Sequence, residues 1–438
     1  MRKKIAFIGA GSVTFTRNLV RDILSYPSLN NSIITLMDID SERLQYSRNI
    51  VKELIKAGGY PAKVYATMDR KEAVQDADGV IITILSGDIS IWRKDIEIPK
   101  KYGVDICIGD TRGPAGVFRF LRTAPDMTEI IRDIEKPAPN ALVLNYTNPM
   151  AMLCRLLQAE SQVRITGLCH SVQHTADMLS KWLGVEDKKI SYLCAGINHQ
   201  SFFLEFYADG EEMTEKIREV SMSPKYYKKD IVRNELCKYL KYYPTESSGH
   251  SSEYLPWFRK REDLLRQYCE IEDSEDWNPG KYAKSIEYYE QQKENWKTEI
   301  EQWLKNPKKN LCRGDEYAAG IFNAFFGDGE EFRFNGNIRN FGIIDNLPWG
   351  CCVETPVVAS KNKLEYIRVG MIPPQTALIN SINAQCEELA VQGYQEKDRE
   401  KIFYSICYDP LTAARLSLKE IREMFDEMFS ANREFIKW

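Results

Sequence analysis

The chain has 438 residues and a formal net charge of −4; 43% of its residues are hydrophobic and 28% are charged. These values are typical of a large globular protein, and the slight negative charge excludes a general attraction to nucleic acid or to an anionic membrane. No apolar run reaches the about 18 residues that suggest a membrane span, and the basic start precedes too few apolar residues for a signal peptide. The eleven cysteines are dispersed and odd in number, which favours reduced thiols and a cytoplasmic location.

The first predicted strand, Lys4 to Ile8, leads at once into the turn Gly9-Ala-Gly11-Ser12 and then into a helical pattern over residues 13–26. A strand, a glycine turn and a helix in this order are the context of a dinucleotide-binding fingerprint. The glycines let the backbone approach a pyrophosphate, and the helix N-terminus supplies N–H donors. Thr14 stands where the third glycine of the usual pattern would be, so the turn alone is a moderate signal.

The second predicted strand, residues 32–38, ends in Asp38. An acid about 20 residues beyond the glycine turn is the usual partner of a ribose hydroxyl and favours NAD over NADP. Asp40 is a near neighbour that could share this role. The alternative is that Asp38 only caps the next helix, which we expect over residues 41–57 with Ser41 as its cap.

The alternation of strands and helices continues through the first half of the chain. Further strands are expected over residues 62–67, 79–85 and 141–145, and we expect the exit Ser86-Gly87-Asp88 to face the cofactor because ligands bind at the carboxyl ends of such strands. The amides of Asn145 and Asn148 at the next strand end could bind sugar hydroxyls or the nicotinamide ribose, or simply form a turn before Pro149. The glycine-rich loop 109–116 either covers the substrate or serves as a connector. Residues 1–195 are therefore predicted to form a Rossmann-like α/β domain with a doubly wound parallel sheet.

Two later strands end in residues that bind metals. Ile165 to Leu168 leads into Cys169-His170-Ser171, and residues 191–197 lead into Asn198-His199. A thiolate and an imidazole brought together make a plausible site for a divalent metal. A buried cysteine beside a hydrogen-bonded histidine is the alternative.

The second half of the chain has a different composition. Residues 210–310 are rich in Lys, Glu, Tyr and Trp and predict a mostly helical wall of the active site. A β segment follows from Glu331, with Asn337 and Arg339 as possible sugar contacts, and helices are expected over 318–326, 375–391, 399–408 and 410–429. Residues 196–438 are therefore predicted to form a second, largely helical α+β domain that carries substrate, metal and oligomer contacts.

Several motifs occur in one order along nearly the whole chain: Gly9-Ala-Gly11-Ser12, Asn145-x-x-Asn148-Pro149, Cys169-His170-Ser171, Gly196-x-Asn198-His199, Asn337-Ile-Arg-Asn340 and Val353-Glu354-x-Pro356. This ordered set resembles glycoside hydrolase family 4, whose members are glycosidases that depend on NAD and manganese. The residues after Cys169, together with Thr245-Glu246-Ser-Ser-Gly-His250 and Glu253-Tyr254-x-Pro-Trp257, resemble the α-galactosidase branch.

The resemblance implies roles for individual residues. It implies Cys169 and His199 as ligands of Mn²⁺, and Tyr254 as the catalytic base, with Glu246, His250 and Glu253 as alternatives. It implies His170 as the acid, at a position where other branches carry an Asp. The implied cofactor and sugar contacts are Gly9, Gly11, Ser12, Asp38, Ser86 and Asn148 for NAD, and Asn145, Asn148, His170, Asn198 and Arg339 for the substrate.

The mechanism implied by the resemblance is a redox elimination, for which family 4 is a known exception to the two-carboxylate rule of glycosidases. NAD⁺ takes a hydride from C3, a base removes the acidified C2 proton, the aglycone leaves from C1, water adds, and the hydride returns. The expected substrate is a small α-galactoside, and the expected assembly a homodimer or homotetramer. Alternatives are the same chemistry on α-galacturonides, α-glucuronides or α-glucosides, with Arg112, Arg119 or Arg339 holding a carboxylate, and two other classes: an NAD-dependent 2-hydroxy-acid dehydrogenase and a non-catalytic NAD sensor.

Overall fold

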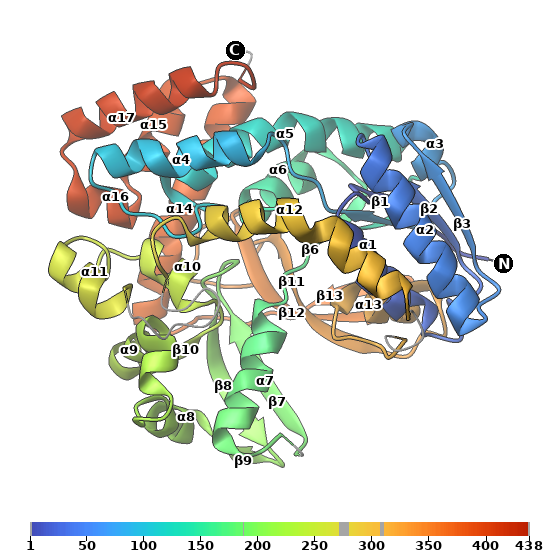
Figure 1. The fold of residues 1–438 in the computed structure, drawn as a ribbon. Helices are drawn as coiled ribbons and strands as arrows, with labels where there is room; N and C mark the ends of the chain where they lie inside the picture. Colours follow the sequence, from blue (N-terminus) through green and yellow to red (C-terminus); the bar gives the residue numbers. More distant parts are fainter. Residues whose placement is uncertain (1, 187, 271–279, 307–310, 437–438) are drawn as a thin grey trace.

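A computed structural model describes residues 2–186, 188–270, 280–306 and 311–436. Six parallel strands form its centre in the order β3-β2-β1-β4-β5-β6 (Figure 1). This is the doubly wound order of a dinucleotide-binding domain, so the Rossmann-like prediction is confirmed. The strands are β1 Lys4–Ile8, β2 Ile33–Met37, β3 Lys63–Thr67, β4 Gly79–Ile82, β5 Leu142–Asn145 and β6 Arg164–Gly167.

Helices cover both faces of this sheet because successive side chains of each strand point to opposite sides. The helices of the first half are α1 Val13–Leu24, α2 Ser41–Gly58, α3 Arg70–Val74, α4 Ile89–Lys101, α5 Gly113–Glu135, α6 Met150–Glu160 and α7 Ser171–Leu183. Ile5 and Phe7 of β1 pack in one core with α1, α2 and α13 (Tyr317–Phe326), whereas Ala6 and Ile8 pack in another with α5, α6, α15 (Arg399–Cys407) and α17 (Leu418–Ala431). Asp40, not Ser41, caps α2, because its carboxylate accepts hydrogen bonds from the N–H groups of Glu42 and Arg43.

The sheet continues beyond β6 with three antiparallel strands from the second half of the chain: β11 Phe332–Arg339, β12 Cys352–Ser360 and β13 Lys363–Tyr366. The sheet is thus mixed rather than purely parallel. It also crosses the domain boundary that the sequence predicts at residue 195, and that boundary stays a prediction.

A small second sheet lies beside the large one. It contains β7 Ile190–Ala195, β8 Phe202–Ala208, β9 Glu211–Glu212 and β10 Tyr243–Pro244. Helical segments follow as expected: α8 Thr214–Ser221, the short 3₁₀ helix Tyr227–Asp230, α9 Ile231–Leu240, α10 Ser248–Glu253, α11 Glu262–Tyr268 and α12 Lys284–Leu304. Helix α12 contacts both α4 and α2 and so runs across the first half of the chain (Figure 1).

The last helices are α13 Tyr317–Phe326, α14 Pro374–Glu396, α15 Arg399–Cys407, α16 Pro410–Arg415 and α17 Leu418–Ala431. The single helix expected over 410–429 is wrong: the chain is extended at Leu416 and Ser417, and Ser417 forms a capping box with Glu420 that starts α17.

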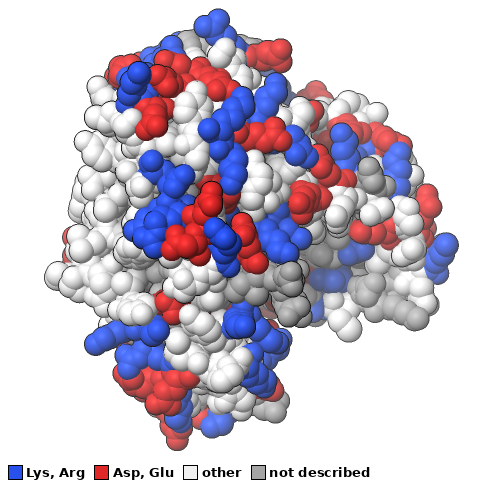
Figure 2. Space-filling view, turned by 60° about the vertical axis from the view of Figure 1, so that its left-hand side comes forward, with Lys and Arg blue, Asp and Glu red and all other residues white. Residues whose placement is uncertain are grey.

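The described residues include no helix that is both long and apolar enough for a membrane crossing. All eleven cysteines are free thiols. On the face drawn in Figure 2, basic and acidic side chains are interspersed rather than gathered by sign.

Candidate active and metal site

The carboxyl ends of the parallel strands deliver the predicted site residues to one edge of the large sheet. The Gly9 turn follows β1, Asn148 follows β5 and Cys169 follows β6. His199 reaches the same edge from the end of β7, because Gly196 forms an antiparallel bridge with Glu354 of β12. His199 has a φ of 60°, an uncommon left-handed conformation. Arg112 holds this turn by donating a hydrogen bond of 2.5 Å to the carbonyl oxygen of Asn198.

Cys169 and His199 lie together as predicted, and Glu246 joins them. The Sγ of Cys169 is 3.2 Å from Nε2 of His199 and 4.0 Å from Oε2 of Glu246, and His199 Nε2 is 3.4 Å from the same Glu246 oxygen. Sulfur, nitrogen and oxygen donors in one buried group suit a divalent transition metal.

The electrostatics of this group also suit a cation. Burial lowers the pKa of His199 to about 4, so its imidazole is neutral and can act as a ligand. Burial, with Glu246 and Glu354 nearby, raises the pKa of the Cys169 thiol well above its usual value. A bound divalent ion would favour the thiolate, as metal coordination does for thiols. The residues present therefore fit a divalent ion.

Thr111 fixes the orientation of His199. Its Oγ1 lies 2.8 Å from Nδ1 of His199, which leaves Nε2 directed at Cys169 and Glu246. Such an outer contact sets the tautomer of a ligating histidine. The glycine-rich loop that contains Thr111 therefore contacts the metal group, and its role in covering the substrate stays a prediction.

Glu253 anchors that loop rather than facing the metal group. Its buried carboxylate accepts hydrogen bonds from the N–H groups of Cys107 and Ile108 at Oε2 (2.9 and 3.0 Å) and of Gly109 at Oε1 (3.0 Å). With all three donors bound, Glu253 has a positioning role, and this geometry argues against it as the base.

His250 lies between two carboxylates, with Nδ1 3.4 Å from Glu246 Oε1 and Nε2 3.4 Å from Asp110 Oδ1. Although burial opposes its charge, Glu246 and Asp110 raise the pKa of His250 to about 9. Asp110 also accepts a hydrogen bond of 3.0 Å from Nδ2 of Asn148. A chain of contacts thus runs from Glu246 through His250 and Asp110 to Asn148, which follows β5.

Tyr254 is buried behind His250, with their ring centroids 5.9 Å apart. The guanidinium of Arg112 stacks on the Tyr254 ring at 4.4 Å. Burial and the carboxylates of Glu253 and Asp110 raise the pKa of Tyr254, whereas Arg112 opposes them. The lowered pKa that a tyrosine base requires is absent from this arrangement of side chains.

Buried polar atoms without a hydrogen-bond partner gather around this group. They include both amide atoms of Asn198, Oδ1 of Asn148, Nη1 of Arg112, Oε1 of Glu354, and Nε and Nη1 of Arg119. Because such atoms are costly to leave unpaired, their gathering indicates a site for a ligand with many polar groups. The fully buried Asn198 amide is the clearest of the predicted sugar contacts.

His170 stands at the outer rim of the site. Its side chain is half-exposed, and Nδ1 lies 3.7 Å from Oε1 of Glu316. Its ring lies against His174, with centroids 4.9 Å apart. Partial burial, together with His174, lowers its pKa.

The glycine turn has the features of a dinucleotide site. Gly9 has a φ of 88°, and Gly11 donates a hydrogen bond of 2.6 Å to Oδ2 of Asp38. A side chain at Gly11 would meet that carboxylate at 2.7 Å. Asp38 is therefore placed beside the turn, whereas Asp40 is committed to capping α2. Ser12 precedes α1 without a side-chain capping bond.

Three predicted contacts have other partners in the structure. Ser86 donates a hydrogen bond of 2.5 Å to Asp126 of α5. Both amide atoms of Asn145 bond the backbone of Thr147, at 2.9 and 3.1 Å. Arg339 lies farther from the group: β11 is antiparallel to β6 with Asn337 opposite Gly167, so Arg339 lies toward the amino end of β6, and its role as a sugar contact stays a prediction. There its guanidinium stacks on Phe341 and donates to the carbonyl of Gly350.

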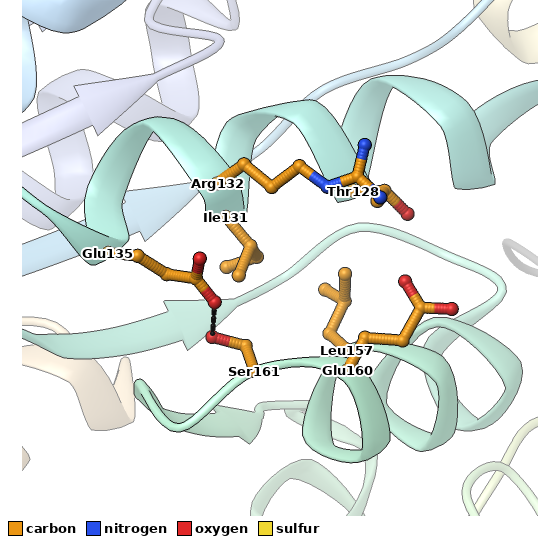
Figure 3. Close-up of a pocket in the computed structure, with 7 residues that line it drawn as sticks. All are labelled: Thr128, Ile131, Arg132, Glu135, Leu157, Glu160 and Ser161. Atoms are coloured by element: carbon orange, nitrogen blue, oxygen red, sulfur yellow. Dashed lines mark hydrogen bonds between the residues drawn. The ribbon is translucent and has the colours of Figure 1, made fainter.

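Two cavities of the described structure lie away from this site. One has a volume of about 300 Å³ and lies between α5 and α6, lined by Thr128, Ile131, Arg132, Glu135, Leu157, Glu160 and Ser161 (Figure 3). These residues precede the amino ends of β5 and β6, at the edge opposite Cys169. The other, of about 320 Å³, includes Lys3 and Asp78, which precede the amino ends of β1 and β4.

Comparisons with known proteins agree with this architecture. The model of the family 4 glycosyl hydrolases matches residues 4–185, and that of the family's C-terminal domain matches residues 194–412. The chain is 36% identical to an α-galactosidase of Bacillus subtilis, over 99% of both chains, and 33% identical to an α-galactosidase of Rhizobium meliloti, over 99% of this chain and 89% of the relative. An α-galacturonidase of Thermoanaerobacterium saccharolyticum is 27% identical, over 99% and 96% of the two chains.

Among solved structures, a 6-phospho-α-glucosidase from gut microorganisms, in complex with NAD and Mn²⁺, shares the fold with a TM-score of 0.81. It is 21% identical and the match covers 99% of each chain. The two family models together match most of the chain, and the two α-galactosidases align with 99% of it. This chain therefore belongs to family 4 of the glycosyl hydrolases.

Proposed function

We propose that the protein hydrolyses α-galactosides with bound NAD and a divalent ion, manganese in the first instance. The observation that carries this proposal is the buried group of Cys169, His199 and Glu246 at the same sheet edge as the Gly9 turn. The α-galactosidases at 33% and 36% identity support the choice of sugar. When bound, NAD supplies reversible hydride transfer, and the ion supplies a Lewis acid for sugar oxygens.

The residues divide this work between them. Cys169 and His199 would hold the ion, while the turn at Gly9, Gly11 and Ser12 would approach the pyrophosphate with Asp38 at the ribose. The unpartnered amides of Asn148 and Asn198 are placed to bind hydroxyls of the sugar or of the nicotinamide ribose. Because Asn145 and Ser86 are bonded within the protein, we assign them the support of these loops.

For the proton transfers we propose Tyr254 as acceptor of the C2 proton at its phenolic oxygen and His170 as donor to the departing oxygen. Tyr254 is supported by its place beside His250 and by the Arg112 cation stacked on its ring, which opposes the rise in its pKa caused by burial and the nearby carboxylates. His170 is supported by its position beside Cys169 and by its exposed ring, which an aglycone could reach.

A decisive assay measures release of p-nitrophenol from p-nitrophenyl α-galactoside under reducing conditions, with NAD⁺ and Mn²⁺ present and then with each omitted. We expect activity only when both are present. Full activity in protein proven free of NAD would refute the redox mechanism. Deuterium at C2 of the sugar should exchange with water during turnover, and its full retention would refute proton removal there.

A second candidate is the same chemistry on an α-galacturonide. It is favoured by Arg119, a buried guanidinium that stacks on Trp92 at 4.4 Å while Nε and Nη1 have no partner. An unpaired buried cation of this kind suits a substrate carboxylate. A panel of galactosides, galacturonides, glucosides and 6-phosphorylated sugars decides between them by kcat/KM. Family membership disfavours the dehydrogenase alternative.

We further propose a cytoplasmic homodimer or homotetramer. Free thiols support the reducing compartment. Large apolar side chains exposed in the segment 341–382 support self-association, among them Trp349 at 74%, Met371 at 73% and Leu378 at 67% exposure. Light scattering coupled to size-exclusion chromatography would give the subunit number, and a monomer at micromolar concentration would contradict it.

A further inference from the structure

Among the acids around the site, Glu246 has a carboxylate oxygen that faces both Cys169 and His199. It follows β10 and directly precedes Ser247, the cap of α10. Its Oε1 accepts a hydrogen bond of 2.9 Å from the N–H of Ser247 and lies 3.4 Å from Nδ1 of His250. These contacts fix the carboxylate so that Oε2 points at Cys169 and His199.

The three facing atoms define a triangle of the size that a metal ion requires. Its sides are 3.2 Å from Cys169 Sγ to His199 Nε2, 3.4 Å from that nitrogen to Glu246 Oε2, and 4.0 Å from that oxygen to the sulfur. The circle through the three atoms has a radius of about 2.1 Å, and a divalent ion such as zinc binds nitrogen, oxygen and sulfur at about 2.0–2.3 Å. The three atoms are therefore spaced so that one divalent ion could be held by all of them.

From this geometry we propose that Glu246 is a third protein ligand of the divalent ion, alongside Cys169 and His199. The inference rests on the metal requirement in the proposed function and adds to it a ligand outside the two motifs that implied the site. A thiolate and a carboxylate together would balance the charge of a divalent cation. With three protein ligands, the ion would keep coordination positions for oxygens of a sugar.

A second group of possible ligands, Asp110, His199 and His250, competes with this assignment. Nδ1 of His199 already has Thr111 Oγ1 at 2.8 Å, and Thr111 itself donates a hydrogen bond of 2.7 Å to Asp110. An ion on that side would have to displace the Thr111 hydroxyl. The Cys169 side requires no such displacement, so the geometry favours Glu246.

As a metal ligand, Glu246 would not act as the base of the reaction. A carboxylate oxygen bound to the ion has less basicity left for a proton of the substrate. Glu246, an alternative to Tyr254 as base, then serves to hold the metal instead.

The test measures metal affinity directly, without turnover. Protein stripped with a chelator under reducing conditions is titrated with Mn²⁺, and the free ion is followed by its electron paramagnetic resonance signal. Glu246→Gln removes the charged ligand, and Glu246→Asp keeps the charge but shortens the side chain. Glu354→Gln is the matched control, because Glu354 is a buried acid whose field acts on Cys169 but whose Oε2 accepts a hydrogen bond from Ser201 instead.

We expect both Glu246 variants to lose at least tenfold in Mn²⁺ affinity and the Glu354 variant to stay within threefold of the unaltered chain. Binding of NADH, followed by its fluorescence, shows that each variant is folded. Unchanged affinity in the Glu246 variants, or an equal loss in Glu354→Gln, overturns the assignment while the metal requirement stands. Should the unaltered chain bind no Mn²⁺ or Co²⁺, the metal requirement of the proposed function falls as well.

Discussion

Replacing Glu253 with glutamine tests whether the loop before Asp110 is held by one buried side chain. The two side chains have the same shape, but one carboxylate oxygen becomes an NH₂ group. In the structure both oxygens accept from backbone N–H groups, two at Oε2 and one at Oε1. Whichever way the new amide turns, at least one N–H of the loop faces another donor in a buried place.

The magnitude follows from these contacts. A hydrogen bond to a charged group is worth about 1.5–3 kcal/mol, and an unsatisfied buried donor costs about 1–3 kcal/mol. We therefore expect a loss of about 3 kcal/mol of stability. The entropy of unfolding scales with chain length at about 2 cal/mol/K per residue, so this loss lowers Tm by about 3 °C in a chain of 438 residues.

Differential scanning calorimetry under reducing conditions measures this shift, and kcat on an α-galactoside measures its consequence for the site. The loop contains Thr111, whose hydroxyl contacts His199. A displaced loop would therefore misalign the metal group, and we expect kcat to fall about tenfold or more. The control is Glu262→Gln on α11, whose side chain is 90% exposed, and its Tm should stay within 1 °C. If Glu253→Gln also keeps its Tm and kcat, the anchoring role is refuted.

Further outcomes follow from other contacts. Thr111→Val should weaken Mn²⁺ binding about 10–100-fold because it removes the partner of His199 Nδ1, while Thr111→Ser should keep it; equal affinities in both titrations would exclude the orienting role. Asp38→Asn should lower the affinity for NAD⁺ and reduce the ratio of the NAD⁺ affinity to the NADP⁺ affinity, both measured by calorimetric titration. An unchanged ratio would show that Asp38 does not bind the ribose. Arg339→Ala should leave kcat/KM within about twofold, since its side chain lies on Phe341 away from the site; a loss of tenfold would restore it as a sugar contact. Dialysis against a chelator should abolish hydrolysis, and added Mn²⁺ should restore it; activity that survives complete metal removal would contradict the metal requirement.

The parallel core of the fold was predictable because its signals are local. Each of β1, β2, β4 and β5 is a short apolar run, and the turn that follows is marked by glycine, Asp or Asn. The antiparallel strands β11 to β13 could be recognised only as a β segment. The first of them, β11, pairs with β6, which lies more than 160 positions earlier in the chain, and no local pattern identifies such a partner.

The site divides in the same way. Cys169 and His199 were predictable because each ends a strand in a recognisable motif, although their meeting depends on the bridge between Gly196 and Glu354. The contact between Thr111 and His199 was not predictable, because no sequence pattern distinguishes a threonine that contacts a distant histidine from any other threonine in a glycine-rich loop. Glu253 was weighed as a base, and only its three backbone donors identify it as an anchor. The place of Arg339 could not be predicted, because the direction of β11 relative to β6 decides where its side chain lies.

The pairing of β11 with β6 has a consequence for how the polypeptide is made. While residues 1–195 emerge from the ribosome, β6 is the outer strand of an otherwise complete parallel sheet, and its partner is still to be synthesised. An uncovered strand edge of this kind is a template for pairing with other chains. A fragment that stops at residue 195 should therefore aggregate or require a chaperone, even though it contains every strand of the cofactor-binding fold.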